Sequence, residues 1–95
     1  MPEGGQITEN NEGLILASRP NGKLMTLATW GEFGGARIRL QVGFVGNDNA
    51  IEWMDIGDPA GYNDTGLTNV SVKGNYFRLV TAGGKGDMKI NWWFG

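Results

Sequence analysis

Residues 33–44 read Phe33-Gly34-Gly35-Ala36-Arg37-Ile38-Arg39-Leu40-Gln41-Val42-Gly43-Phe44. After the Gly-Gly pair, apolar residues occupy every second position, and polar residues or glycine stand between them. Successive side chains of a β-strand point to opposite faces of its sheet, so this alternation is typical of a strand with one buried and one solvent-facing side. The stretch therefore predicts a half-buried strand over 36–44.

Further short apolar segments follow the same theme, separated by turn residues such as Asn21-Gly22 and Gly83-Gly84. Glycine supplies 17 of the 95 residues and falls between these segments, as turn residues do. The predicted strands span 14–17, 23–30, 36–44, 50–56, 67–73, 75–82 and 88–94. About seven strands with turns roughly every ten residues indicate an all-β, single-domain β-sandwich over 13–95, which we expect to be an antiparallel jelly roll.

The apolar positions of these segments predict the core. We expect it to contain Leu24, Leu27, Ile38, Leu40, Val42, Ile51, Trp53, Val70, Val72, Phe77, Leu79, Met88, Ile90 and Trp92.

The first residues, 1–12, differ from the rest of the chain. They contain three glutamates and a Gly-Gly pair, and Ile7 is the one aliphatic residue after Met1. Such a segment buries too little apolar surface to offset its ordering entropy. We expect a flexible N-terminal arm, or one that becomes ordered against a neighbouring chain.

Composition argues against several classes of function. The chain has no histidine and no cysteine, which removes the commonest general base and the commonest metal ligands. Neither Ser18 nor Ser71 lies in a Gly-x-Ser-x-Gly motif. Eight basic and ten acidic residues are interspersed for a net charge of −2, so no positive field attracts nucleic acid. We expect no enzyme, no cofactor, no contact with nucleic acid or membrane, and a soluble protein made in the cytoplasm.

Acidic residues offer the remaining candidates for chemistry. Glu52 and Asp55 share one short strand, and Asp58 and Asp64 lie in the loop that follows. No pair stands at a spacing that requires shared acid and base chemistry, so solvation of a strand and a loop is the favoured interpretation. Calcium binding by residues 47–49 or by the 58–64 loop stays open as a weaker alternative to ordinary turns.

The C-terminal run Trp92-Trp93-Phe94 carries more aromatic surface than one sheet face can bury. In a strand, Trp92 and Phe94 share one face and Trp93 points to the other. Either Trp93 is a half-exposed ring, or it contacts another chain, where aromatic anchors concentrate. A carbohydrate platform is a third possibility. We predict Ile7, Trp93 and Phe94 as interface residues.

Four segments, in order, resemble small β-sandwich virion structural proteins of tailed bacteriophages. Residues 30–41 are similar to their "GxFGGAxVxLQ" strand, and 50–56 to the "TxWxxV" strand after it. Residues 74–84 are similar to "GxYRLxxxGG", and 88–93 to the final "SVNAWL" strand. The resemblance covers residues 24–94, and the ending Trp93-Phe94-Gly95 is more apolar than the family pattern.

The resemblance implies a structural role in the virion and transfers no catalytic residue. We expect a capsid decoration protein that binds the major capsid protein or another virion protein and stabilises the outer capsid surface, as a homo-oligomer, either trimer or dimer. A tail, neck or fibre-attachment protein is the alternative within the virion. A carbohydrate-binding module is the alternative of a different class.

Overall fold

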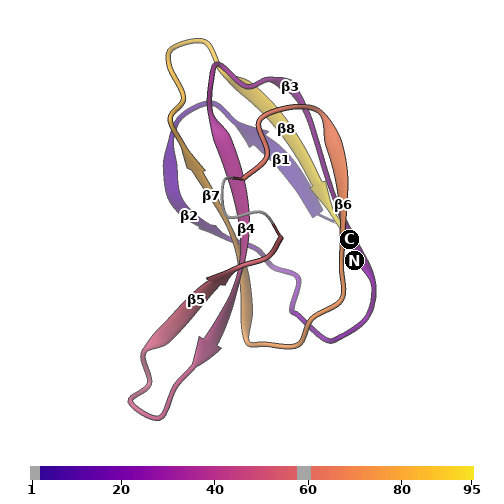
Figure 1. Ribbon diagram of the computed structural model, residues 1–95, viewed down its shortest axis with the longest axis vertical. Helices are drawn as coiled ribbons and strands as arrows, with labels where there is room; N and C mark the ends of the chain where they lie inside the picture. Colours follow the sequence, from indigo (N-terminus) through magenta and orange to yellow (C-terminus); the bar gives the residue numbers. More distant parts are fainter. Residues whose placement is uncertain (1–2, 58–60) are drawn as a thin grey trace.

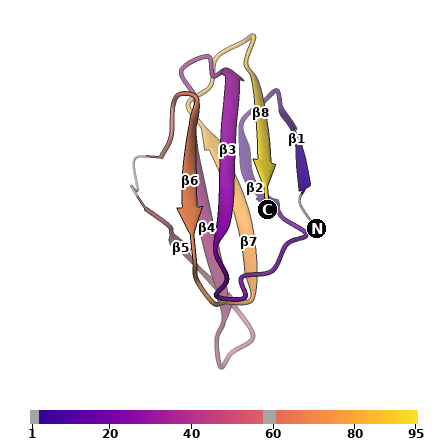
Figure 2. The same cartoon turned by 90° about the vertical axis from the view of Figure 1, so that its right-hand side faces the viewer.

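Eight antiparallel strands in two four-stranded sheets make up the fold, as a computed structural model describes it for residues 3–57 and 61–95. The first sheet has the order β1 (Glu3–Ile7), β8 (Lys89–Phe94), β3 (Met25–Glu32), β6 (Gly66–Val70). The second has the order β2 (Asn11–Ile15), β7 (Tyr76–Ala82), β4 (Arg37–Val45), β5 (Ile51–Asp55). The two sheets pack face to face (Figures 1 and 2).

The strand order is that of a jelly roll. β1 pairs with β8, β2 with β7, β3 with β6 and β4 with β5, as if one long hairpin were folded over into two layers. Two four-stranded antiparallel sheets with this nesting define the jelly roll. The predicted fold class is confirmed, with eight strands in place of seven.

β4 follows the alternation in its sequence. Ile38, Leu40 and Val42 are at most 5% exposed and face the other sheet, whereas Arg37 and Arg39 lie on the outer side. Gly34 and Gly35 form the turn before β4 with φ of +58° and +82°, a backbone region that favours glycine. The half-buried strand predicted from this stretch is confirmed.

The core lies between the two sheets and receives side chains from most strands. Its buried members are Ile7, Leu16, Leu27, Phe33, Ala36, Ile38, Leu40, Val42, Val70, Phe77, Leu79, Met88, Ile90, Trp92 and Phe94. Val72 is partly buried against them.

Three predicted core residues lie outside this core. Leu24 is 72% and Ile51 39% exposed, and Trp53 is partly exposed. Leu24 and Leu27 are an odd number of positions apart, so one extended strand could not turn both inward. Ile51 and Trp53 pair with Val45 and Gly43, which lie on the outer side of β4.

The N-terminal segment is also different from the prediction. Glu3–Ile7 forms the edge strand β1 instead of a flexible arm, and Asn11 begins β2. Ile7 pairs with Ile90 and is 6% exposed. The carboxylate of Glu3 accepts hydrogen bonds from the backbone N–H groups of Ala17 (2.9 Å) and Ser18 (3.3 Å). Pairing with β8 supplies the hydrogen bonds that the polar segment could not make alone.

Candidate functional site

Trp93 lies on the outer side of the first sheet. In β8, Ile90, Trp92 and Phe94 face the core, which turns Asn91 and Trp93 outward. Trp93 stands opposite Ala28 of β3 and Gly4 of β1. These small neighbours leave the indole 40% exposed.

Two further large apolar side chains share this side of the sheet. Trp30 of β3 stands opposite Asn91, and Leu67 of β6 stands opposite Ala28. Trp30 is 44% and Leu67 76% exposed. Gly4, Trp93, Ala28 and Leu67 thus form one row across all four strands, with Trp30 in the adjacent row.

Uncharged polar side chains surround these apolar residues. The Gln6 amide donates to the Asn91 side-chain oxygen at 3.2 Å, and the Thr26 hydroxyl to the Asn69 side-chain oxygen at 2.9 Å. Of the described residues in these strands, charges on this side come from Glu32 and Lys89, which stand opposite each other in the register at one end of the β3–β8 pair. We call this surface the aromatic face; it consists of Gly4, Gln6, Thr26, Ala28, Trp30, Leu67, Asn69, Asn91 and Trp93.

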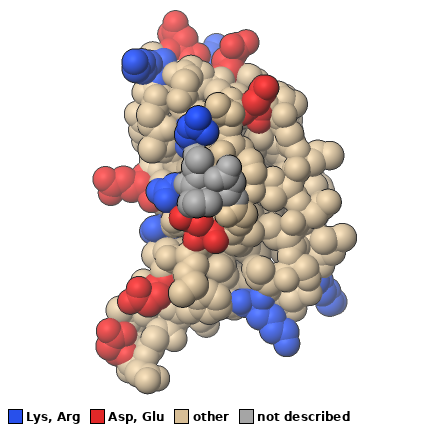
Figure 3. Space-filling view, in the orientation of Figure 1, with Lys and Arg blue, Asp and Glu red and all other residues tan. Residues whose placement is uncertain are grey.

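The aromatic face lies toward the viewer in Figure 2, over β6, β3, β8 and β1. In the space-filling view, the middle of the right-hand flank, along which this sheet runs, shows no blue or red atoms (Figure 3). An uncharged surface with two exposed tryptophans is the kind of surface that binds a partner.

Two of the three predicted interface residues are buried within this chain. Ile7 is 6% and Phe94 0% exposed, because strand pairing turns both toward the core. The Phe94 ring contacts Phe77 edge to face, with centroids 4.9 Å apart. Trp93 remains available for a contact, and the prediction for it stays open.

Sequence reasoning missed Trp30 and Leu67. For Trp30, the strand alternation alone was a sufficient signal. Once Leu27 is assigned to the core, the even positions Ala28 and Trp30 must face outward. Nothing in the sequence, however, indicates that β6 pairs with β3 and places Leu67 beside Ala28.

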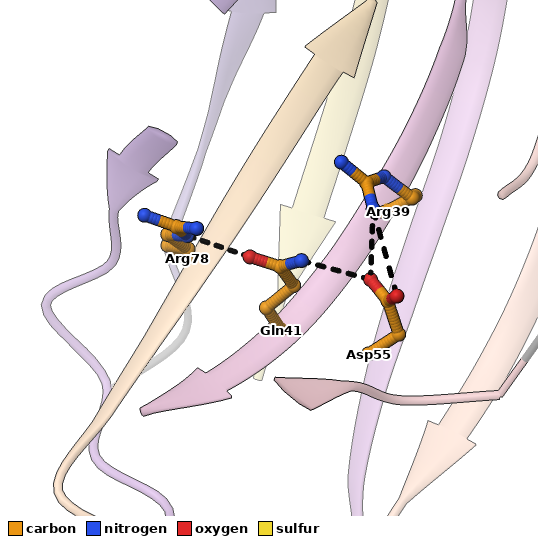
Figure 4. A network of polar contacts seen from close by, with 4 residues as sticks. All are labelled: Arg39, Gln41, Asp55 and Arg78. Atoms are coloured by element: carbon orange, nitrogen blue, oxygen red, sulfur yellow. Dashed lines mark hydrogen bonds and ion pairs between the residues drawn. The ribbon is translucent and has the colours of Figure 1, made fainter. Parts of the chain in front are cut away.

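The outer side of the second sheet carries a polar network instead (Figure 4). Arg78 donates to Gln41 at 2.7 Å, Gln41 donates to Asp55 at 2.8 Å, and Arg39 pairs with Asp55 at 3.3 Å. The Arg78 guanidinium lies 4.2 Å from the centre of the Trp53 ring. Burial lowers the pKa of Arg78 below its usual value, the charge of Arg39 lowers it further, and the charge of Asp55 opposes both.

The acidic residues do not converge. Asp55 is bound by Arg39 and Gln41, whereas Glu52 points to the opposite side of β5. Asp64 accepts the N–H of Thr65, and Asp58 lies outside the described residues. No group of three or more His, Cys, Asp or Glu side chains that could hold a metal ion occurs in residues 3–57 and 61–95.

Residues 47–49, where calcium binding was the weaker alternative, have ordinary turn geometry, and the Gly-Gly segments also form turns. Asp48 accepts the N–H of Ala50 at 3.1 Å, and Asn49 has a φ of +64°, as expected for an Asx turn. Gly34 accepts a hydrogen bond from Lys85, which ties the two Gly-Gly loops together.

One hollow of the described surface lies at the end of the sandwich where Gly95 lies. It encloses about 430 Å³ and is lined by Glu3, Ala17, Ser18, Arg19, Asn21, Met25 and Gly95. The Glu3 carboxylate in this hollow already accepts hydrogen bonds from two backbone N–H groups, those of Ala17 and Ser18.

This chain matches no known protein-family model, no curated protein and no solved structure. In the described part of the chain there is no helix of the length and apolarity that a membrane crossing requires.

Proposed function

We propose that this chain is a non-enzymatic structural protein of a bacteriophage virion, which decorates the outer capsid surface by docking through the aromatic face. The observation that supports it is the uncharged surface formed jointly by Trp30, Leu67 and Trp93. The sequence resemblance to phage virion proteins suggests the capsid as the partner.

Two physical arguments favour a docking role for this surface. Tryptophan buries a large area at little entropic cost, and such anchors dominate binding energy at interfaces. A capsid also presents the same site many times, so a self-associating domain gains affinity through avidity even when each contact is weak. The absence of charge on the face indicates that apolar contact, and not electrostatic steering, would hold the complex together.

A carbohydrate-binding module is the second candidate, and one arrangement favours it. Trp30 and Trp93 lie diagonally across two paired strands, and the amides of Asn91 and Gln6 lie beside them. A sugar ring could stack on an indole while its hydroxyls bond to the amides, since ligand sites combine apolar surfaces with a few polar groups. Jelly rolls serve both capsid and lectin proteins, so the fold does not decide between them.

The experiment uses purified virions and particles made without this chain. We expect the chain to be found in the virions and to co-sediment with the particles that lack it. Trp93→Ala and Trp30→Ala should each weaken binding by about 2 kcal/mol, or roughly 30-fold. Ile15→Ala is the matched control, because Ile15 is 54% exposed on the second sheet.

The outcomes separate the candidates. Electron microscopy of the bound particles distinguishes the capsid from the tail, neck or fibre attachment. Binding to a glycan array that the two tryptophan variants lose, without binding to particles, would support the carbohydrate module instead. Capsid binding that both tryptophan variants retain in full would refute docking through the aromatic face.

A further inference from the structure

β5 forms one edge of the second sheet, with β4 as its neighbour in the strand order. The β4–β5 hairpin extends beyond the rest of the sandwich at the lower left of Figure 1. The side chains of Val45, Ile51 and Met54 on this hairpin are 42%, 39% and 59% exposed. An extended strand edge with apolar side chains is a surface on which another strand can add.

Hydrogen bonding shows which backbone groups of β5 face this edge. The N–H of Ile56 bonds to the carbonyl of Leu40, and the N–H of Gly46 bonds to the carbonyl of Ala50. In an antiparallel pair, alternate residues bond to the neighbour and those between them point away. The even-numbered residues of β5 therefore bond to β4, and Ile51, Trp53 and Asp55 direct their N–H and carbonyl groups outward.

β5 is short and carries two acidic residues, Glu52 and Asp55, but it lacks three other features that commonly protect an edge strand. Its sequence Ile51-Glu52-Trp53-Met54-Asp55 contains no lysine and no proline, and its pairing with β4 has no bulge. The opposite edge strand, β2, by contrast has a register shift between Asn11 and Leu14. Lysine, proline and bulges are among the means by which proteins prevent edge pairing.

Side chains on the outer face hold β5 in place. Asp55 is bound by Arg39 and Gln41 (Figure 4). The Arg78 guanidinium lies over the Trp53 ring. Trp53 also covers Gly43, where a Cβ atom would lie 2.8 Å from the indole. The strand is thus ordered before any partner binds, which lowers the entropic cost of association.

We propose that β5 pairs antiparallel with β5 of a second copy of this chain, across a two-fold axis at Trp53. Trp53 then stands opposite Trp53 of the second copy, Ile51 opposite Asp55, and Glu52 opposite Met54. Three pairs of outward-facing residues each exchange two backbone bonds, about six in all. The two second sheets join into one continuous eight-stranded sheet.

Other two-fold registers are less favourable. A shift toward the hairpin tip sets Glu52 opposite Glu52 of the second copy, which is repulsive. A shift the other way sets Met54 opposite Met54. Either shift leaves two pairs of outward-facing residues bonded in place of three. In the favoured register, Asp55 brings no uncompensated charge, because Arg39 pairs with it.

This inference is independent of the proposed function. It concerns the edge of the second sheet, whereas the aromatic face belongs to the first, and both surfaces can be occupied together. A chain that is monomeric would overturn the dimer and leave docking through the aromatic face untouched. Trp93→Ala should leave the dimer intact.

Sedimentation of the whole chain tests the register through charge. The interface is small and belongs to the weak class, so the measurement covers roughly 1 µM to 1 mM. Met54→Lys places an opposite charge against Glu52 of the second copy and should preserve or tighten the dimer. Met54→Glu places two like-charged pairs there and should weaken it by about tenfold or more. Ile15→Lys and Ile15→Glu, on β2, control for net charge.

A second pair of variants tests the backbone contact. Ile51→Pro removes an outward N–H without removing a bond to β4, and should abolish the dimer. Ile51→Ala keeps the N–H and should retain most of the association. Circular dichroism verifies that both variants are folded.

Four results would overturn the proposal. One is a monomeric wild-type chain over the whole concentration range. Another is equal weakening by Met54→Lys and Met54→Glu, which would set Met54 opposite itself. The others are dimerisation by a folded Ile51→Pro variant and loss of the dimer in Trp93→Ala.

Discussion

Phe94 connects the two sheets of the sandwich, and its truncation should be among the most damaging single changes. Its side chain is fully buried on β8 of the first sheet. It contacts Phe77 on β7 of the second sheet, with ring centroids 4.9 Å apart and planes at 80°. Phe94→Ala removes this contact and leaves a cavity between the sheets.

The expected cost follows from burial and from the ring pair. Removing a fully buried phenylalanine side chain destabilises a protein by about 3–5 kcal/mol, cavity included. The edge-to-face pair contributes about 1 kcal/mol of such a loss. We expect the free energy of unfolding to fall by about 4 kcal/mol. A domain of this length has roughly 5–14 kcal/mol in total, so the variant should be folded but marginal.

Equilibrium unfolding in urea, followed by tryptophan fluorescence, measures this loss. With a slope of about 2 kcal/mol per molar urea, the midpoint should fall by about 2 M. Phe94→Leu fills part of the cavity and should lose about half as much. Trp93→Ala, the exposed neighbour, should cost less than about 1 kcal/mol. A loss below 1 kcal/mol for Phe94→Ala, or an equal loss for Trp93→Ala, would refute the assignment of Phe94 to the inner side and Trp93 to the outer side of β8.

Two further substitutions test the segments that differ from the sequence-based expectation. Ile7→Ala should lower the free energy of unfolding by about 2–4 kcal/mol, as measured by urea unfolding, because Ile7 is buried beside Ile90. An unchanged urea midpoint would support the flexible arm instead. Trp53→Ala should lower the free energy of unfolding by about 1–2 kcal/mol, because the ring is partly buried and contacts Arg78. A loss as large as that of Phe94→Ala would indicate that the Trp53 ring lies in the core.

The sequence alone determined the fold class and the faces of its clearest strands. In 36–44 the apolar and polar residues alternate without interruption, so burial of Ile38 and Leu40 leaves one side for Arg39 and Gln41. The same reasoning separated Trp93 from its two neighbours. Such inferences succeed because the period of a strand is a local property of the backbone.

Tertiary structure decided everything that depends on which strands become neighbours. Around β5, apolar residues occupy both odd and even positions: Ile51 and Trp53, and Met54 and Ile56. The sequence therefore did not decide which set faces the core, and pairing of Ile51 and Trp53 with the outer positions of β4 placed the odd set outside. The polar segment around Ile7 became a strand because β8 offered an open edge. The aromatic face likewise gathers residues from β1, β3, β6 and β8, since interstrand hydrogen bonds join residues far apart in the sequence and no local pattern records them.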